Sequence, residues 1–197
     1  MLTALHKSRE TRLHSLRVSA AARAMASASR LFSGATEPAL ILQNAAAELA
    51  ERPGSLCVLS LMSHETQRLW PVAVEYAGRC PAYLLRGLVA RTRPLAVDAF
   101  SRSAQRGRHA IRVPIAAPQQ LRMWFPRPYW RYADRVTVAE VLAAPMVHHE
   151  QVVGTILLLR ESGQRAYRDT DEHYVAELAR RLGLMIGGLG VGSPALS

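Results

Sequence analysis

The chain has 197 residues, of which 49% are hydrophobic and 20% charged, so it can bury a sizeable core and does not belong to the disordered class. No apolar run approaches the roughly 20 residues that cross a bilayer, and the first 35 residues lack the apolar stretch of a secretory signal. Two cysteines cannot form a disulfide framework or a four-thiolate zinc site. We therefore expect a cytoplasmic protein without membrane insertion. The Arg-rich, nearly acid-free start also suits a mitochondrial transit peptide, which is the competing interpretation.

Positive charge is concentrated in the middle of the chain. The 25 basic and 15 acidic residues give a net charge of +10, and residues 79–135 hold twelve arginines against Asp98 and Asp134. Such an excess predicts an anionic ligand, an acidic partner or nucleic acid at that region. Because Lys7 is the only lysine, a coding bias towards arginine is the competing explanation, and it would leave a solvated basic surface.

The first 52 residues have the pattern of two helices. Residues 3–32 contain neither proline nor glycine, which favours one long amphipathic helix, and Gly34 ends it. A second helix begins near Pro38 and stops before Pro53-Gly54. The stripe of the first helix consists of Leu2, Leu5, Leu13, Leu16, Ala20, Ala24 and Leu31.

Four apolar runs predict two β-hairpins, each with a polar turn. The first joins residues 56–62 to 69–76, and the second joins residues 141–147 to 152–160. Between the hairpins, the pattern predicts helices at 82–90 and within 94–107, a short strand at 108–114, and an irregular, proline-rich segment at 115–135.

The last element that the sequence predicts is a helix that begins at an acidic cap. Asp169, with Glu172 three residues later, predicts a capping box, and the apolar face continues to about Ile186.

The C-terminal hairpin and helix carry a resemblance to the GAF domain family. Two segments joined by a polar turn resemble that family's last pair of strands. They are Val141-Leu142-Ala143-Ala144-Pro145-Met146 and Val153-Gly154-Thr155-Ile156-Leu157-Leu158-Leu159-Arg160. The segment from Tyr167 to Asp171, followed by Tyr174-Val175-Ala176-Glu177-Leu178-Ala179, is similar to its closing helix. The text from Leu40 to Met62 resembles its first helix and strand.

The resemblance implies an α+β fold in which helices pack on a six-stranded antiparallel sheet, preceded by a long N-terminal helix. It implies sensing or regulation, a small-molecule cavity under the variable middle, and pairing of two chains through terminal helices. The chain then divides into a dimerisation or signalling helix at 1–35, a GAF-like domain at 36–190 and a flexible tail at 191–197.

The richest chemistry lies in residues 119–132, which hold five aromatics and three arginines. Tryptophan faces can stack on a planar ligand, and arginines pair with phosphate or carboxylate. A lid that packs on the domain without binding anything is the alternative, since each tryptophan buries a large apolar area. As ligand-binding candidates we take Arg108, Arg112, Arg122, Trp124, Trp130 and Arg131.

The sequence predicts neither catalytic residues nor a metal site. Cys57 lies in an apolar strand and should be inert, whereas Cys80 in a basic loop could have a lowered pKa. His148-His149-Glu150 has metal-binding side chains, but in a tight turn they point to opposite faces, so we interpret it as a polar turn. No motif identifies a cofactor.

Together these patterns predict a non-catalytic, homodimeric sensory or regulatory domain that binds a planar anionic small molecule and acts on a signalling partner. A nucleic-acid-associated regulator that uses the surface of residues 79–135 is one alternative, although no helix-turn-helix pattern is visible. A thiol-dependent enzyme that acts through Cys80 is the other.

Overall fold

The computed structural model describes most of the chain as helices around one sheet. It describes residues 2–33, 37–52, 56–63, 68–78, 99–124, 127, 130 and 137–189. In chain order the elements are α1 Leu2–Ser33, α2 Pro38–Glu51, β1 Leu56–Met62, β2 Leu69–Tyr76, α4 Ala99–Gly107, β3 Ile111–Pro114, α5 Pro118–Trp124, β4 Val138–His148, β5 Gln151–Glu161 and α7 Asp169–Gly188. None of these helices combines the length and apolar character needed to span a bilayer.

The sheet is antiparallel throughout and confirms both predicted hairpins. Its strand order is β2-β1-β5-β4-β3, so β1 pairs with both β2 and β5, and β4 pairs with both β5 and β3. The described residues form five strands, and the expectation of six is therefore wrong. That number came from the resemblance, whereas the sequence patterns predicted five strands: the four apolar runs of the hairpins and the short strand at 108–114.

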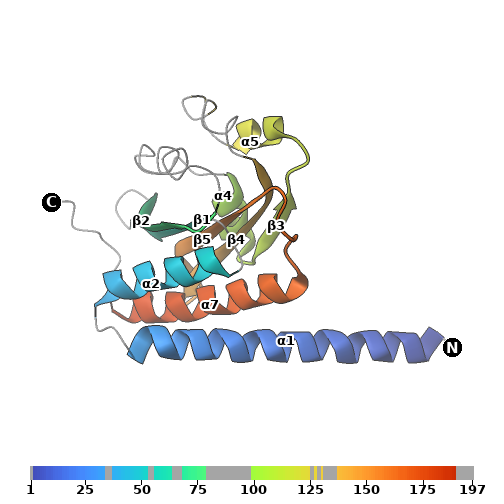
Figure 1. The fold of residues 1–197 in the computed structure, drawn as a ribbon. Helices are drawn as coiled ribbons and strands as arrows, with labels where there is room; N and C mark the ends of the chain where they lie inside the picture. Colours follow the sequence, from blue (N-terminus) through green and yellow to red (C-terminus); the bar gives the residue numbers. More distant parts are fainter. Residues whose placement is uncertain are drawn as a thin grey trace.

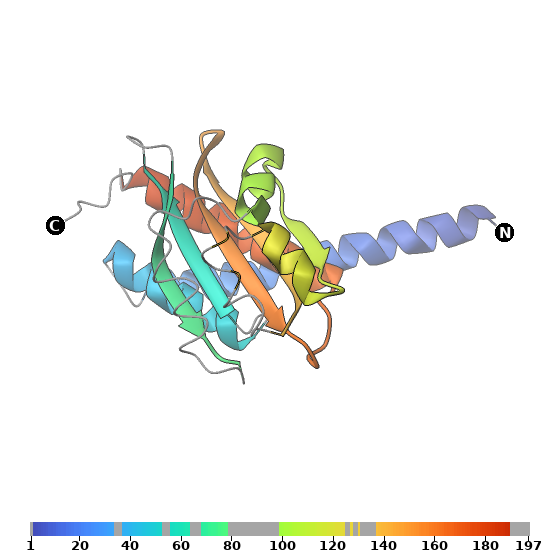
Figure 2. The ribbon, with the colours of Figure 1, turned by 90° about the horizontal axis from the view of Figure 1, so that it is seen from above.

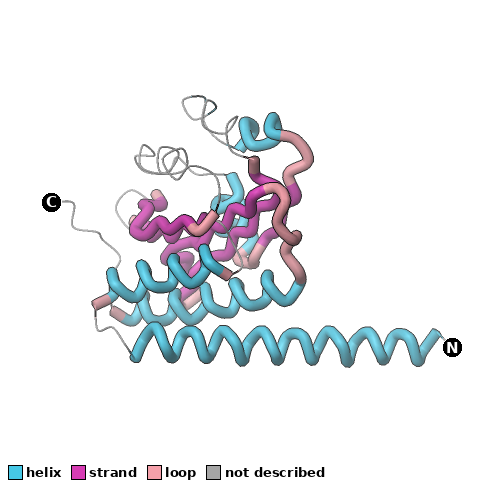
Figure 3. Tube along the Cα trace, viewed as in Figure 1, coloured by secondary structure: helices cyan, strands magenta, loops and turns pink. Residues whose placement is uncertain are grey.

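Helices cover both faces of the sheet. In Figure 1, α2 and α7 lie on one face with α1 as a further layer beneath them, and α4 and α5 lie on the other face. The tube view in Figure 3 shows the same helix and strand layers. Alternate residues of β1 feed the two cores: Cys57, Leu59 and Leu61 pack with α1, α2 and α7, whereas Leu56 and Val58 pack with Phe100 of α4 and Leu121 of α5.

Helix α1 runs parallel to α7 and is held against it by small side chains. Arg23 contacts Thr170 and Ser27 contacts Tyr174, so a step of four residues along α1 matches a step of four residues along α7. Ala20, Ala24 and Ala28 are buried in this contact, and α1 and α7 can approach closely because alanine projects so little. The C-terminal part of the predicted stripe is thus covered by α7 of the same chain.

The N-terminal half of α1 extends past the domain. Figure 2 shows it projecting well beyond the sheet and the other helices. Among residues 11–19, Leu16 alone is half-buried and the others are exposed. At 1.5 Å per residue, residues 2–19 correspond to a projection of about 27 Å.

The hairpin of β4 and β5 ends in a turn that forces two ordinary residues into the left-handed region. His149 and Glu150 have φ values of 43° and 64°. Positive φ at both central positions defines a type I′ turn, whose twist matches that of paired strands and which usually uses Asn-Gly. The polar turn predicted at 148–151 is therefore confirmed, with β4 and β5 longer than the sequence indicated.

Helix α7 is capped one residue earlier than predicted. Its N-cap is Arg168, whose backbone N–H donates to Oδ2 of Asp171 at 2.9 Å. Asp171 therefore has the role that the sequence assigned to Glu172. Asp169 and Glu172 instead form ion pairs with Arg112.

Gly154 generates the first testable prediction, because it pairs with Leu61 of β1 and Met146 of β4 at the centre of the sheet. A Cβ there would collide with the carbonyl oxygen of Ser60 and the ε-methyl of Met146. Gly154→Val should therefore lower the free energy of unfolding by about 1 to 3 kcal/mol, measured as a lower urea midpoint.

The matched control for this prediction is Gly188→Ala. No described atom lies within 4 Å of a Cβ built at Gly188, and alanine favours a helix more than glycine does, so the midpoint should not fall. Equal midpoints for wild type and Gly154→Val would contradict the crowding.

Candidate functional site

The predicted lid contains a small cluster of cations around one aromatic ring. Nε1 of Trp130 donates to the backbone carbonyl of Arg122 at 3.0 Å. The guanidinium carbons of Arg122 and Arg127 each lie 5.7 Å from the centroid of the Trp130 ring. Leu121, which is 2% exposed, anchors α5 to the sheet beside this cluster. The ring thus contacts two guanidinium groups, which leaves less of its face for stacking on a planar ligand than the sequence suggested.

The structure does not bring the other described candidates to this cluster. Arg112 is on β3 between Ile111 and Val113, whose side chains pack on the α4 side, so Arg112 extends towards α7. There it donates to the Tyr167 carbonyl at 2.9 Å and pairs with Asp169 at 3.2 Å. Glu140 lies 3.7 Å from Arg112 and accepts the Tyr167 N–H at 2.6 Å.

Arg108 lies at a third place. It follows α4 with a φ of 54° and is 3.9 Å from Glu150 in the turn between β4 and β5. With Pro145, Val147 and Arg180 it lines an open hollow of about 400 Å³. The side chain of Trp124 and the whole of Arg131 lie outside the described part of the chain. A ligand-binding role for these six residues stays a prediction.

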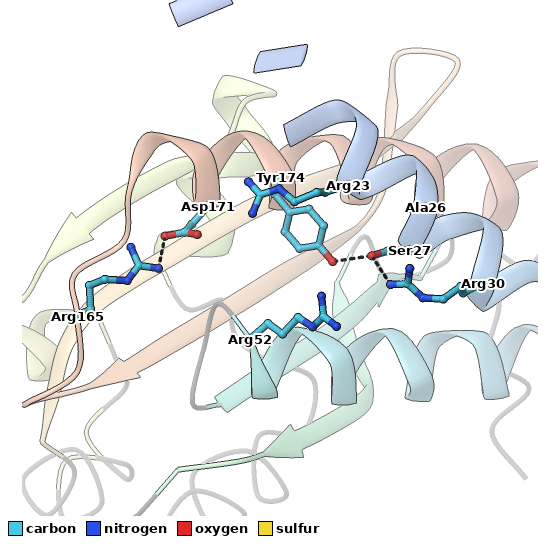
Figure 4. Close-up of a pocket in the computed structure, with 8 residues that line it drawn as sticks. All are labelled: Arg23, Ala26, Ser27, Arg30, Arg52, Arg165, Asp171 and Tyr174. Atoms are coloured by element: carbon cyan, nitrogen blue, oxygen red, sulfur yellow. Dashed lines mark hydrogen bonds and ion pairs between the residues drawn. The ribbon is translucent and has the colours of Figure 1, made fainter. Parts of the chain in front are cut away.

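A pocket that the sequence did not predict lies where α1 meets the domain. Figure 4 shows it between α1, the end of α2 and the start of α7. Its volume is about 260 Å³. We call it the interhelical pocket. Its lining consists of Arg23, Ala26, Ser27, Arg30, Arg52, Arg165, Asp171 and Tyr174. These residues come from four separate segments, so no local motif could have indicated it.

Two residues of this lining, Ser27 and Tyr174, are hydrogen-bonded to the carboxylate of the neighbouring Glu48. Its Oε1 accepts from the hydroxyls of Ser27 at 2.6 Å and Tyr174 at 3.0 Å, and from Arg30 at 3.1 Å. Burial raises the pKa of the Tyr174 phenol, and the negative charge of Glu48 adds to that rise. Tyr174 therefore stays neutral at physiological pH and acts as a hydrogen-bond donor to Glu48.

The described residues contain no group of three or more His, Cys, Asp or Glu side chains able to hold a metal ion. The rings of His148 and His149 meet edge to face with centroids 4.1 Å apart. Cys80 lies outside the described residues, so the thiol-enzyme alternative is not tested by this geometry.

Cys57 generates the second testable prediction. Its side chain is completely buried, and burial, followed by the charge of Glu75, raises the pKa of the thiol. Because the thiolate is the nucleophile, Cys57 should resist iodoacetamide at pH 8 in the folded protein, as measured by peptide mass spectrometry. Urea-unfolded protein is the control and should be alkylated. Modification of Cys57 at equal rates in both states would contradict the prediction.

No known protein-family profile matches this sequence, and no curated protein matches it significantly. Solved structures do match in fold. The GAF domain of a phosphoenolpyruvate-protein phosphotransferase from Acinetobacter has a TM-score of 0.63, covering 90% of this chain and 96% of that one at 13% identity. A GAF domain/HD domain protein from Geobacter sulfurreducens has a TM-score of 0.62, covering 82% and 99% at 18% identity.

A third similar structure is the free methionine-R-sulfoxide reductase from Neisseria meningitidis, solved with its substrate. It has a TM-score of 0.57 and 16% identity, covering 83% of this chain and 87% of that one. The fold is therefore GAF-like, which confirms the resemblance seen in the sequence. At these identities the likeness defines the fold, and function must be argued from the sites.

Proposed function

We propose that this protein is a non-catalytic sensory or regulatory domain of the cytoplasm, which pairs as a homodimer through α1 and passes the state of its GAF-like domain to a signalling partner. The observation that carries the proposal is the geometry of α1, half docked on α7 and half projecting into solvent. A helix that is packed on the core at one end and exposed to solvent at the other is suited to transmitting a conformational change from the domain to its surroundings.

The exposed half of α1 supports pairing with a second copy. The stripe that packs on α7 continues N-terminally as Leu16 and Leu13, the latter 37% exposed. These leucines lie beyond the start of α7, where no other described helix or strand covers them. Burying them against the same face of a second α1 would form a short parallel coiled coil.

Deletion of residues 1–18 tests the dimer and is the third testable prediction. The deletion stops before Ala20 and so spares the part of α1 that packs on α7. Full-length protein should be a dimer in multi-angle light scattering, and the truncated protein a folded monomer. Leu13→Glu/Leu16→Glu should behave like the truncation, whereas Val18→Glu, at a 56% exposed position, is the matched control and should stay dimeric. A dimer that survives the deletion would exclude pairing through this segment.

The ligand in the proposal is a planar anion held by the lid. The support is the gathering of Arg122 and Arg127 at Trp130, since guanidinium groups that share one aromatic ring are preorganised and attract an anion to one place. Because Arg122 and Arg127 already lie beside the Trp130 ring, the two guanidinium groups would supply most of the affinity for the anion.

A thermal-shift screen of nucleotides and aromatic carboxylates is the fourth testable prediction. An anion that stabilises wild type should bind Arg122→Ala about 10 to 150-fold more weakly, since a charge-assisted hydrogen bond is worth about 1.5 to 3 kcal/mol. The melting temperature of the unliganded variant should stay near that of wild type. Trp130→Ala, which removes packing, should instead lower it without ligand. Equal ligand shifts in wild type and Arg122→Ala would refute the lid.

The same protein preparations test the alternatives. DNA binding that weakens steeply with salt would favour the nucleic-acid regulator. Turnover that disappears when Cys80 is alkylated would favour the thiol enzyme. The non-catalytic proposal rests on the burial of Cys57, which raises the pKa of its thiol, and on the scarcity of carboxylates near the lid.

A further inference from the structure

Four arginines line the interhelical pocket, and only two carboxylates lie beside them: Asp171 in the lining and Glu48 next to Ser27 and Tyr174. Arg30 pairs with Glu48 at 3.1 Å, and Arg165 pairs with Asp171 at 3.1 Å. The two carboxylates are well covered, with side chains 16% and 12% exposed, whereas the two arginines reach into solvent at 57% and 47%. Each of these pairs is neutral as a unit.

The other two arginines have no carboxylate partner among the described residues. The Arg23 guanidinium reaches only the Thr170 carbonyl, at 3.5 Å, and lies 5.7 Å from the Tyr174 ring centroid. Arg52 forms no side-chain hydrogen bond or ion pair with the part of the chain that the structure describes. Two positive charges therefore stay unbalanced within one small pocket.

We propose that the interhelical pocket binds a doubly charged tetrahedral oxyanion, either free phosphate or the phosphate of a small phosphomonoester. A dianion balances the charges of Arg23 and Arg52, and guanidinium groups match phosphate oxygens geometrically. Figure 4 shows the four arginines around the pocket on different sides, an arrangement that suits a tetrahedral anion better than a planar carboxylate. A volume of about 260 Å³ admits a phosphate with a small substituent.

The site lies on the opposite side of the sheet from the lid and couples its ligand to α1. Arg23 belongs to α1, and Arg52 follows α2, so one anion between them links the long helix to the domain. A ligand that binds only when α1 is docked stabilises the docked state by mass action. The inference does not depend on the sensory role or on the lid, because none of the lid residues lines this pocket.

Titration of the full chain with inorganic phosphate tests the site, using calorimetry at constant ionic strength. Glycerol phosphate serves as the phosphomonoester probe, and succinate as a dicarboxylate of equal charge. We expect saturable binding of phosphate or glycerol phosphate and much weaker binding of succinate. Arg52→Gln should weaken binding at least tenfold and leave the melting temperature in phosphate-free buffer unchanged, since Arg52 has no described partner. Arg106→Gln, an exposed arginine on α4, is the matched control and should bind within twofold of wild type.

Hydrogen exchange gives the second measurement. Saturating phosphate should slow amide exchange in residues 20–31 of α1 in wild type and leave it unchanged in Arg52→Gln. Three results would overturn the proposal: no binding of either phosphate probe at tens of millimolar, equal affinities for Arg52→Gln and Arg106→Gln, or succinate bound as tightly as phosphate. The dimer and lid experiments vary neither Arg23 nor Arg52, so failure here leaves those proposals standing.

Discussion

The close approach of successive layers on one side of the sheet is the constraint on which the rest of the structure depends. At Gly183 of α7, a Cβ would lie 2.6 Å from the backbone oxygen of Val147 and 2.9 Å from the carbonyl carbon of Met146. Helix α7 therefore rests directly on the backbone of β4. On its outer side, Ala20, Ala24 and Ala28 let α1 approach in the same way. Small residues set both spacings, and the spacings in turn place Ser27 and Tyr174 within 3.0 Å of each other in the lining of the interhelical pocket.

This layering places arginines that are intermixed along the sequence in two different environments. Arginines occur all along the chain, yet their surroundings differ with the face of the sheet on which they lie. Arg122 lies beside an aromatic ring, and Arg112, on the face towards α7, lies among three carboxylates. Arg112 is thus part of the packing that holds the start of α7 against β3 and β4, because an ion network of this density fixes side chains and leaves little of the guanidinium to a ligand.

The local patterns of the sequence predicted most of the helices and strands, because periodicity and turn chemistry are written in neighbouring residues. The run from Val152 to Arg160 and the turn before it, for example, define a hairpin without reference to the rest of the chain. The interhelical pocket could not be predicted in this way. Arg23 and Arg165 are brought together only by the docking of α1 on α7, and the same docking determines that Ala20 is covered within the chain. The number of strands, taken from a resemblance in place of a pattern, was wrong, and helix α5 lies within the segment 115–135 that the prolines had indicated as irregular.

The projecting half of α1 makes the contact with α7 a pivot with a long arm. A tilt of about 10° at that contact moves a tip about 27 Å away by about 5 Å, close to one turn of a helix. The domain can therefore convert an adjustment of about 1 to 2 Å along the docked part of α1 into a displacement large enough to change which side chains face each other at the far end. A short α1 packed along its whole length would have no such mechanical gain.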